Sequence, residues 1–146
     1  INNGPLSEPA RSNGTLNVGA GSKPMNGAYN IDLENFNPEI GVYQGDATLM
    51  EGIVDGSQST IYFENPYNYY PINENSIRVL ESNGKMEIIG SPSNKYVNHT
   101  PQYCEEFGLN YELSEIQNVG QYTRSNGTVI SPETTPTFLH YTVTKP

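Results

Sequence analysis

Residues 77–90, IRVLESNGKMEIIG, carry the strongest local signal in this chain. Two runs in which apolar and polar residues alternate flank Asn83-Gly84. A type I′ turn needs positive φ at both central positions, and Asn followed by Gly tolerates this best. The stretch therefore predicts a two-residue β-hairpin, whose register would pair Val79 with Ile88.

The two faces of the predicted hairpin differ in character, because side chains alternate along a strand. One face is apolar and is expected to lie in the core. That face carries Ile77, Val79, Met86 and Ile88. The other face is mixed and places Arg78 diagonal to Glu87, which makes it the first candidate for a binding surface.

Similar signals occur on both sides of this stretch. Residues 48–63 are centred on Asp55-Gly56, and residues 121–130 contain Asn126-Gly127, so each predicts a further hairpin. Residues 137–144, TFLHYTVT, have the alternation of a closing strand.

A single short helix is predicted near residues 101–107. Thr100 is the expected N-cap, Pro101 suits the first turn, and Gly108 can end the helix in the left-handed conformation. The predicted fold class is therefore mainly β: a twisted antiparallel β-sheet or sandwich built from hairpins, with one short α-helix.

The first 27 residues are rich in Gly, Pro, Asn and Ser and have little periodicity. We interpret residues 1–27 as a flexible arm or linker, with at most an edge strand at residues 15–18, and residues 28–146 as a single β-rich domain. Residues 19–23, GAGSK, resemble a phosphate-binding loop. They lack the Walker spacing and a following helix, so they are assigned to the linker.

Composition limits the possible partners. The 146 residues include 7 Lys and Arg against 16 Asp and Glu, a formal charge of −9. Binding to nucleic acid rests on a basic surface, so no nucleic-acid partner is expected. Insertion into a membrane is not expected, because no apolar run approaches the roughly 20 residues of a spanning helix. Cys104 is the single cysteine, which excludes an intrachain disulfide.

No catalytic or metal-binding constellation stands out in the sequence. There is no Gly-x-Ser-x-Gly elbow, and His99, His140 and Cys104 do not have the spacing of a metal site. We therefore predict no catalytic residue, no metal ligand and no cofactor. The many Glu residues leave open a glycoside hydrolase with paired carboxylates and a calcium ion bound at the acidic surface.

The tyrosines are the most informative side chains. Residues 64–74, ENPYNYYPINE, form a Pro-bounded loop that is followed closely by Arg78. Carbohydrate sites combine flat aromatic faces with a few hydrogen-bonding groups, and this neighbourhood supplies both. The candidate glycan-binding residues are Tyr67, Asn68, Tyr69, Tyr70 and Arg78. The simpler alternative is that these tyrosines only pack the loop.

Three segments resemble a known family. These are residues 49–66 (LMEGIVDGSQSTIYFENP), Asn83-Gly84-Lys85, and residues 137–146 (TFLHYTVTKP). With them the chain resembles the lectin-like head of a rotavirus outer-capsid spike protein, from a divergent rotavirus group. The resemblance implies host cell-surface carbohydrate and the remainder of the spike polypeptide as partners, and the virion surface as the location. The chain has no Trp, and no site residue of that family is carried over.

The expected function is thus a non-enzymatic attachment domain that binds host glycans. A protein-interaction or structural module of a bacterial surface, pilus or phage tail is the alternative, and an enzyme comes third.

Overall fold

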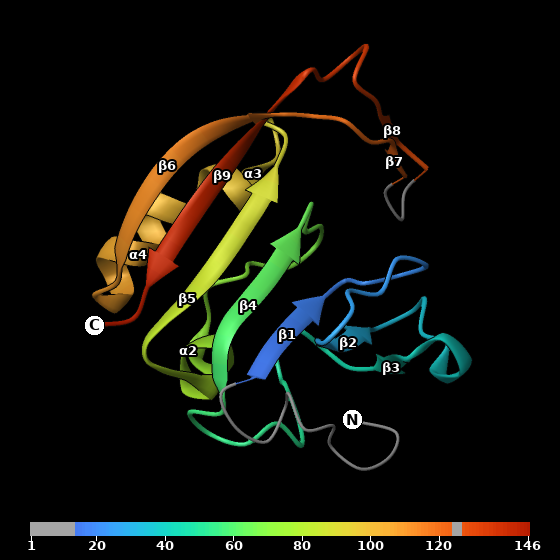
Figure 1. The fold of residues 1–146 in the computed structure, drawn as a ribbon. Coiled ribbons are helices and arrows are strands. Elements are labelled where there is room, and N and C mark those ends of the chain that lie inside the picture. Colours follow the sequence, from blue (N-terminus) through green and yellow to red (C-terminus); the bar gives the residue numbers. More distant parts are fainter. Residues whose placement is uncertain (1–13, 124–126) are drawn as a thin grey trace.

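The protein is described by a computed structural model that covers residues 14–123 and 127–146, with the backbone alone at Tyr122. A seven-stranded sheet with the order β3-β2-β1-β4-β5-β9-β6 forms its centre (Figure 1). Its strands are β1 (Gly14–Val18), β2 (Tyr29–Asp32), β3 (Val42–Gln44), β4 (Gln58–Glu64), β5 (Leu80–Gly90), β6 (Asn110–Gln117) and β9 (Thr137–Thr144). The remaining elements are η1 (Pro38–Ile40), α2 (Glu74–Val79), α3 (Lys95–Asn98), α4 (Thr100–Phe107), β7 (Tyr122–Thr123) and β8 (Val129–Ile130).

The sheet is mostly parallel. Strands β3, β2, β1, β4 and β5 run in the same direction, and β9 runs antiparallel to its neighbours β5 and β6. Parallel neighbours need crossover connections, which is the pattern of α/β proteins. The prediction of a mainly-β sandwich built from hairpins is therefore wrong: the chain has an α/β fold.

The stretch at residues 77–90 is not a hairpin. Its first residues belong to α2, and β5 then runs through Asn83-Gly84, where Asn83 has φ 66°. The ammonium of Lys145 donates to the carbonyls of Ile77 and Leu80 at 2.8 and 2.7 Å and so satisfies the end of α2. The Lys145 backbone pairs with Asn83 and Gly84. These nonlocal bonds turn the Asn-Gly signal into an irregularity within one strand.

The hairpin predicted around Asp55-Gly56 is also wrong, because β4 lies between the parallel strands β1 and β5. Residues 46–56 form turns instead. The Arg78 guanidinium holds them by donating to the carbonyls of Ile53 and Met50 at 2.9 and 3.0 Å and by pairing with Asp55 at 2.6 Å.

The N-terminal part of the described chain enters the sheet rather than hanging from it. Strand β1 is hydrogen-bonded between β2 and β4, and Leu16 and Val18 are buried. Asn17 is also buried, where its amide donates to Asn30 at 3.0 Å across the two strands. The structure therefore assigns residues 14–18 to the centre of the domain; residues 1–13 lie outside the described chain.

The prediction of a single helix is wrong, because the described chain also contains α2 and α3. Three local predictions of position are confirmed. Helix α4 begins with Pro101 in its first turn and ends at Gly108 with φ 70°, although Thr100 donates to the carbonyl of Val97 rather than capping the helix. Strand β9 spans the predicted residues 137–144. Strands β7 and β8 form the predicted antiparallel pair; Asn126 of their expected turn lies outside the described residues.

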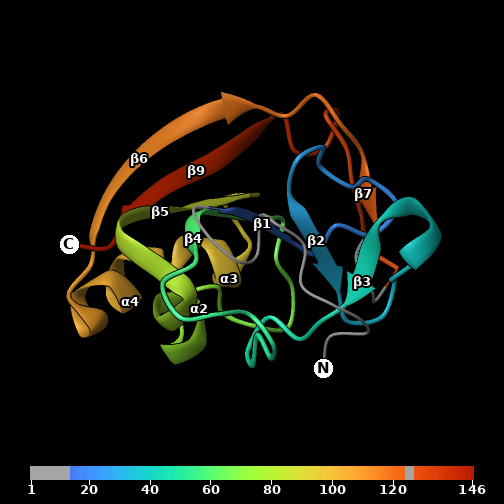
Figure 2. The ribbon, with the colours of Figure 1, turned by 60° about the horizontal axis from the view of Figure 1, so that its bottom comes forward.

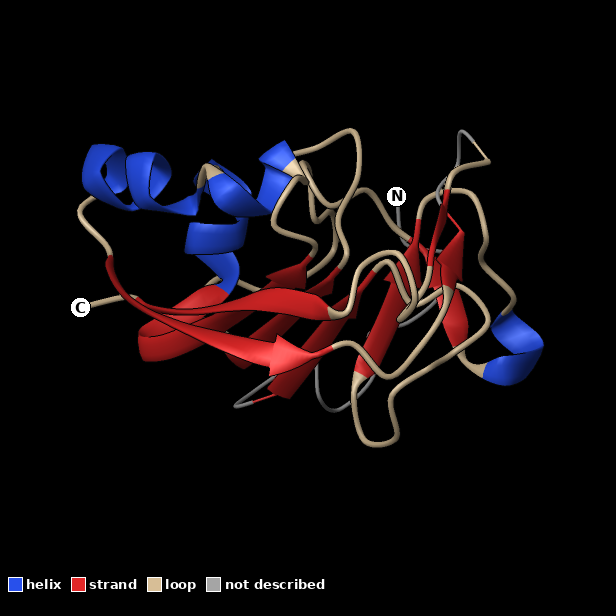
Figure 3. Cartoon of the chain, turned by 90° about the horizontal axis from the view of Figure 1, so that it is seen from above, coloured by secondary structure: helices blue, strands red, loops and turns tan. Residues whose placement is uncertain are grey.

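The helices that follow β4 and β5 gather on one face of the sheet. Figures 2 and 3 show α2, α3 and α4 on this side. The core lies between them and the sheet, and it contains Ile61, Phe63, Met86, Ile88 and Val97. No helix in the described ranges is both long and apolar enough to cross a membrane.

Candidate functional site

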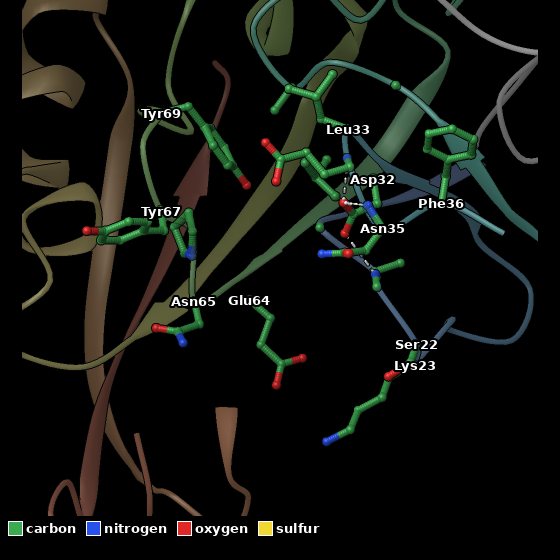
Figure 4. A pocket seen from close by; sticks show the side chains of 18 of the residues that line it. Ser22, Lys23, Asp32, Leu33, Asn35, Phe36, Glu64, Asn65, Tyr67 and Tyr69 are labelled. Atoms are coloured by element: carbon green, nitrogen blue, oxygen red, sulfur yellow. Dashed lines mark hydrogen bonds between the residues drawn. The ribbon is translucent and has the colours of Figure 1, made fainter. Parts of the chain in front are cut away.

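A cleft of about 1050 Å³ opens at the carboxyl ends of the first four strands. The sheet order reverses between β1 and β4, and ligands of open α/β sheets bind at such a switch point. In Figure 4, Asp32, Asn35 and Phe36 lie on one side of the cleft, and Tyr67 and Tyr69 lie on the other. The side chains of Glu64 and Lys23 extend into the space between the two sides. The volume is in the range of small-molecule sites.

The loop after β1 forms one edge of the cleft. Gly19 and Gly21 have φ 76° and 54°, a region that glycine adopts without strain. The backbone N–H groups of Gly19 and Ala20 donate to the carbonyl of Ile31, and that of Gly21 donates to the Asp32 carboxylate at 3.0 Å. The loop is therefore bound to β2 through its own N–H groups.

Asp32 is the organising carboxylate of this edge. Its second oxygen accepts from the backbone N–H groups of Glu34 and Asn35 at 3.1 and 2.9 Å. A carboxylate offers about four acceptor positions, and these contacts with the Gly21 bond use three of them. Asp32 therefore fixes two loops and keeps room for one further donor.

The segment after β4 forms the opposite edge in an unusual conformation. Asn65 and Asn68 have φ 52° and 67°, which non-glycine residues adopt rarely. Two bonds hold the segment: the Asn65 N–H donates to the carbonyl of Ile89 at 2.6 Å, and Asn94 donates to the carbonyl of Pro66 at 2.8 Å. The Asn65 Oδ1 atom is buried and accepts no hydrogen bond from any described group. Asn is the side chain that tolerates this region best, so the two asparagines let the chain turn sharply at the edge of the cleft.

Tyr69 connects the two edges. Its ring packs against Phe63 with centroids 6.3 Å apart, and its hydroxyl lies 3.9 Å from the position that a Cβ on Gly19 would take. Burial raises the pKa of the Tyr69 hydroxyl, and the Asp32 carboxylate raises it further. The hydroxyl therefore stays protonated at neutral pH and is available as a hydrogen-bond donor.

The structure separates the residues that were predicted to form one site. Tyr67, Asn68 and Tyr69 line the cleft. Tyr70 instead packs against Tyr103 of α4, with ring centroids 4.7 Å apart. Arg78 is not among the residues that line the cleft; it holds the turns at residues 46–56.

Sequence reasoning missed the other half of the cleft. The local pattern assigns residues 19–23 to a linker, and it gives the carboxylates of the cleft no role. The carboxylates that line it are Asp32, Glu34, Asp46 and Glu64. A positional signal was present: Asp32 and Glu64 are the last residues of β2 and β4, and Asp46 lies two residues after β3.

Other reactive groups contribute little to the cleft. Burial raises the pKa of the Cys104 thiol to about 11, so this residue is a neutral thiol in the core. Across residues 14–123 and 127–146, no three His, Cys, Asp or Glu side chains are arranged to hold a metal ion.

Comparison with known proteins rests on structure alone. No protein-family model and no curated protein matches the sequence. Precorrin-6y C5,15-methyltransferase from Geobacter metallireducens is similar, with a TM-score of 0.55 and 15% identity, over 90% of this chain and 78% of that one. The 30S ribosomal A1408 methyltransferase from an uncultured bacterium gives a TM-score of 0.54 and 14% identity, over 94% and 89%. The YcgJ protein of Bacillus subtilis gives 0.52 and 12%, over 90% and 91%.

These similarities correct the functional predictions. The resemblance to a rotavirus spike head is wrong, because the chain has the mixed α/β sheet of these proteins and not the fold of a viral lectin. The predictions that depended on this resemblance are wrong as well: attachment to glycans, and host carbohydrate and the spike polypeptide as partners. The structural-module alternative is contradicted by the same similarities. The prediction that the chain is not an enzyme is likewise contradicted by its likeness to methyltransferases. At these identities, the comparisons establish the fold alone: the chain has a Rossmann-like α/β fold.

Proposed function

We propose that this chain is a methyltransferase that uses S-adenosylmethionine. The observation that carries the proposal is a glycine loop at the switch point of the sheet whose N–H groups are already bonded within the protein. Such a loop fits a nucleoside but cannot cradle phosphates. The likeness to two methyltransferases supports the same assignment.

A dinucleotide cofactor does not fit this cleft. Rossmann dinucleotide sites place the pyrophosphate at the N-terminus of the helix that follows the glycine loop. Here β1 leads through turns directly into β2. The Gly19, Ala20 and Gly21 N–H groups that would face a phosphate bond to Ile31 and Asp32. The lining also has four carboxylates against one lysine, Lys23.

The residues present do fit S-adenosylmethionine. Asp32 has one acceptor position left, which suits a ribose hydroxyl, and Gly19 and Gly21 leave the backbone open to a flat nucleoside. The cleft carboxylates attract the positive sulfonium and amino groups, since opposite charges a few ångström apart gain on the order of 1–4 kcal/mol. When bound, this cofactor supplies a methyl group activated by a positively charged sulfur.

The chain's own groups then define where an acceptor is held. Tyr69 and Asn68 stand between the cleft and a second cavity described below. Because the Tyr69 hydroxyl is protonated, it can donate a hydrogen bond but cannot remove a proton from the acceptor at neutral pH. Glu64, at the end of β4, is the carboxylate of the β4 edge that extends into the cleft and can accept such a proton (Figure 4).

The test is calorimetric titration with S-adenosylhomocysteine, S-adenosylmethionine, NAD⁺ and ATP. We expect the two sulfur nucleosides to bind with a Kd on the order of micromolar and the phosphorylated nucleotides not to bind. Asp32→Asn should weaken binding at least about 10-fold, since it removes a charge-assisted contact. Glu115→Gln on the exposed strand β6 is the matched control.

Because Asp32 also fixes two loops, Glu64→Gln serves as a second variant, which changes a carboxylate on the opposite edge of the cleft and leaves the Asp32 contacts in place. Equal affinity for NAD⁺ and S-adenosylhomocysteine, or no binding of any nucleoside by the folded wild-type protein, would refute the proposal.

A further inference from the structure

A second cavity of about 440 Å³ adjoins the cleft. Thr48, Asn68 and Tyr69 line both spaces, so the two meet at a shared wall. The far side of the second cavity is formed by α4 through Tyr103, Glu106 and Phe107. A molecule in this cavity would therefore lie next to the cleft, with Thr48, Asn68 and Tyr69 bordering both.

Fixed aromatic rings form much of this cavity. The Tyr70 and Tyr103 rings meet at 4.7 Å with a tilt of 35°. Behind them, His99 stacks on Tyr70 at 6.0 Å, with the Tyr70 hydroxyl 3.3 Å from its Nδ1. Phe107 leaves 37% of its surface exposed at the rim. These contacts hold the rings in place before any ligand arrives.

The charged side chains that line the cavity are all acidic. Glu74 and Glu106 line it, and none of its described lining residues is Lys or Arg. The Glu106 carboxylate lies near enough to Tyr103 to contribute, after burial and Tyr70, to the raised pKa of the Tyr103 hydroxyl. Aromatic faces beside carboxylates are the surroundings that attract organic cations.

The same charges disfavour a polyanionic acceptor. Binding to nucleic acid requires Lys and Arg groups that face phosphates, whereas this chain has a formal charge of −9. Two of its cations are committed elsewhere: Arg78 holds the turns at residues 46–56, and Lys145 caps α2.

We infer that the methyl acceptor is an organic ammonium group on a flexible aliphatic chain, held between the aromatic rings and the two carboxylates of this cavity. The inference rests on the proposed function and names its substrate class. A free polyamine and a lysine side chain both present this group. Before transfer, the nitrogen would have to give one proton to a base, for which Glu64 is the carboxylate proposed above. Its lone pair would then form the new N–C bond while the S–C bond of the sulfonium breaks, with the electron pair of that bond staying on sulfur.

Binding of the cation is measured directly, without methyl transfer. Spermidine and a lysine-containing peptide are titrated calorimetrically, together with the same peptide acetylated on the lysine amine and a short RNA oligonucleotide. We expect the two ammonium probes to bind and acetylation to abolish binding of the peptide. Preference between spermidine and the peptide identifies the source of the group.

Matched variants locate the site. The double variant Glu74→Gln and Glu106→Gln should weaken binding of the ammonium probes about 10-fold, because the bound cation loses the two carboxylates that attract it. The single variant Glu106→Gln should weaken binding several-fold, whereas Glu105→Gln, which removes one charge from the same helix α4 but does not line the cavity, should change binding less than about 2-fold. Equal weakening by Glu106→Gln and Glu105→Gln, or binding of the acetylated peptide or of RNA in place of the ammonium probes, would overturn the inference.

The same proteins are titrated with S-adenosylhomocysteine. If the nucleoside binds and the ammonium probes do not, the acceptor inference fails and the proposed function stands. If the nucleoside does not bind, the proposed function fails, and the cavity loses its role as an acceptor site.

Discussion

Gly90 offers a sharp test of how the site is supported. It ends β5 where α3 crosses the sheet, and a Cβ there would lie 2.7 Å from Cγ2 of Val97 and 3.5 Å from Oδ1 of Asn65. Carbon atoms pack best at about 3.5–4.0 Å, so the added methyl would overlap Val97 by about 1 Å. Val97 is fully buried and β-branched, so its side chain cannot rotate away at low cost. The backbone of α3 or β5 must move instead.

Gly90→Ala should therefore lower the free energy of unfolding by about 1–3 kcal/mol, the usual cost of overpacking a core. Val97→Ala alone should cost about 2 kcal/mol, for two methyl groups and the space they leave. The double variant removes the overlap. Its loss should fall short of the sum by most of the Gly90→Ala cost, because the two residues interact through one contact.

Urea unfolding followed by tyrosine fluorescence gives these free energies, and thermal unfolding should show a parallel shift of about 2–4 °C per kcal/mol. A neutral Gly90→Ala variant, or strict additivity in the double variant, would mean that α3 does not approach β5 as the structure shows.

Two other predictions concern stability. Burial raises the pKa of Cys104 to about 11 and that of Tyr29 to about 12, above their ordinary values of 9.0 and 10.0. As the pH rises, the unfolded chain loses the protons of these two side chains before the folded chain does. The stability that the two groups contribute is therefore complete below about pH 9 and is lost as the pH rises toward 12. The urea concentration at the midpoint of unfolding should fall over that range, and a midpoint that does not change with pH would contradict the burial of the two groups. Asn94→Ala removes both a buried donor to Pro66 and the cap of α3, so it should cost about 2–4 kcal/mol. Asn98→Ala, which loses an exposed bond to Pro92, should cost less than about 1 kcal/mol in the same urea titrations.

Elements whose signals are complete within a few residues could be predicted from the sequence. Helix α4 has Pro101 at its start and Gly108 at its end, and its contacts follow from this local pattern. The sequence predicts at most an edge strand at residues 15–18, and the central place of β1 in the sheet could not be recognised in this way. The strand is short, and its central residue Asn17 is polar; the bond that makes a buried amide acceptable comes from Asn30 on the next strand. Local composition therefore resembled a linker.

At Asn83-Gly84, in contrast, a local preference for a turn is present, but hydrogen bonds from a distant part of the chain outweigh it. The pair adopts the positive φ that a turn requires at Asn83, but Lys145 bonds to both the strand and the end of α2 from more than 55 residues away. A two-residue turn is worth little against several such bonds, each contributing about 0.5–1.5 kcal/mol. Reading the pair as a hairpin made the neighbouring strands antiparallel.

The prediction of antiparallel pairing also hides the site. In an antiparallel hairpin, the carboxyl ends of successive strands lie at opposite edges of the sheet, so Asp32 and Glu64 would have had no reason to converge. In a parallel sheet, all carboxyl ends share one edge, and every segment that directly follows a strand becomes a candidate for the same cleft. Under that rule the loop at residues 19–23, Asp32, Asp46 and Glu64 form one set, as they do in the structure. Both the fold and the site thus depend on whether neighbouring strands pair in parallel or antiparallel, and this pairing is fixed by contacts that no local window of this sequence contains.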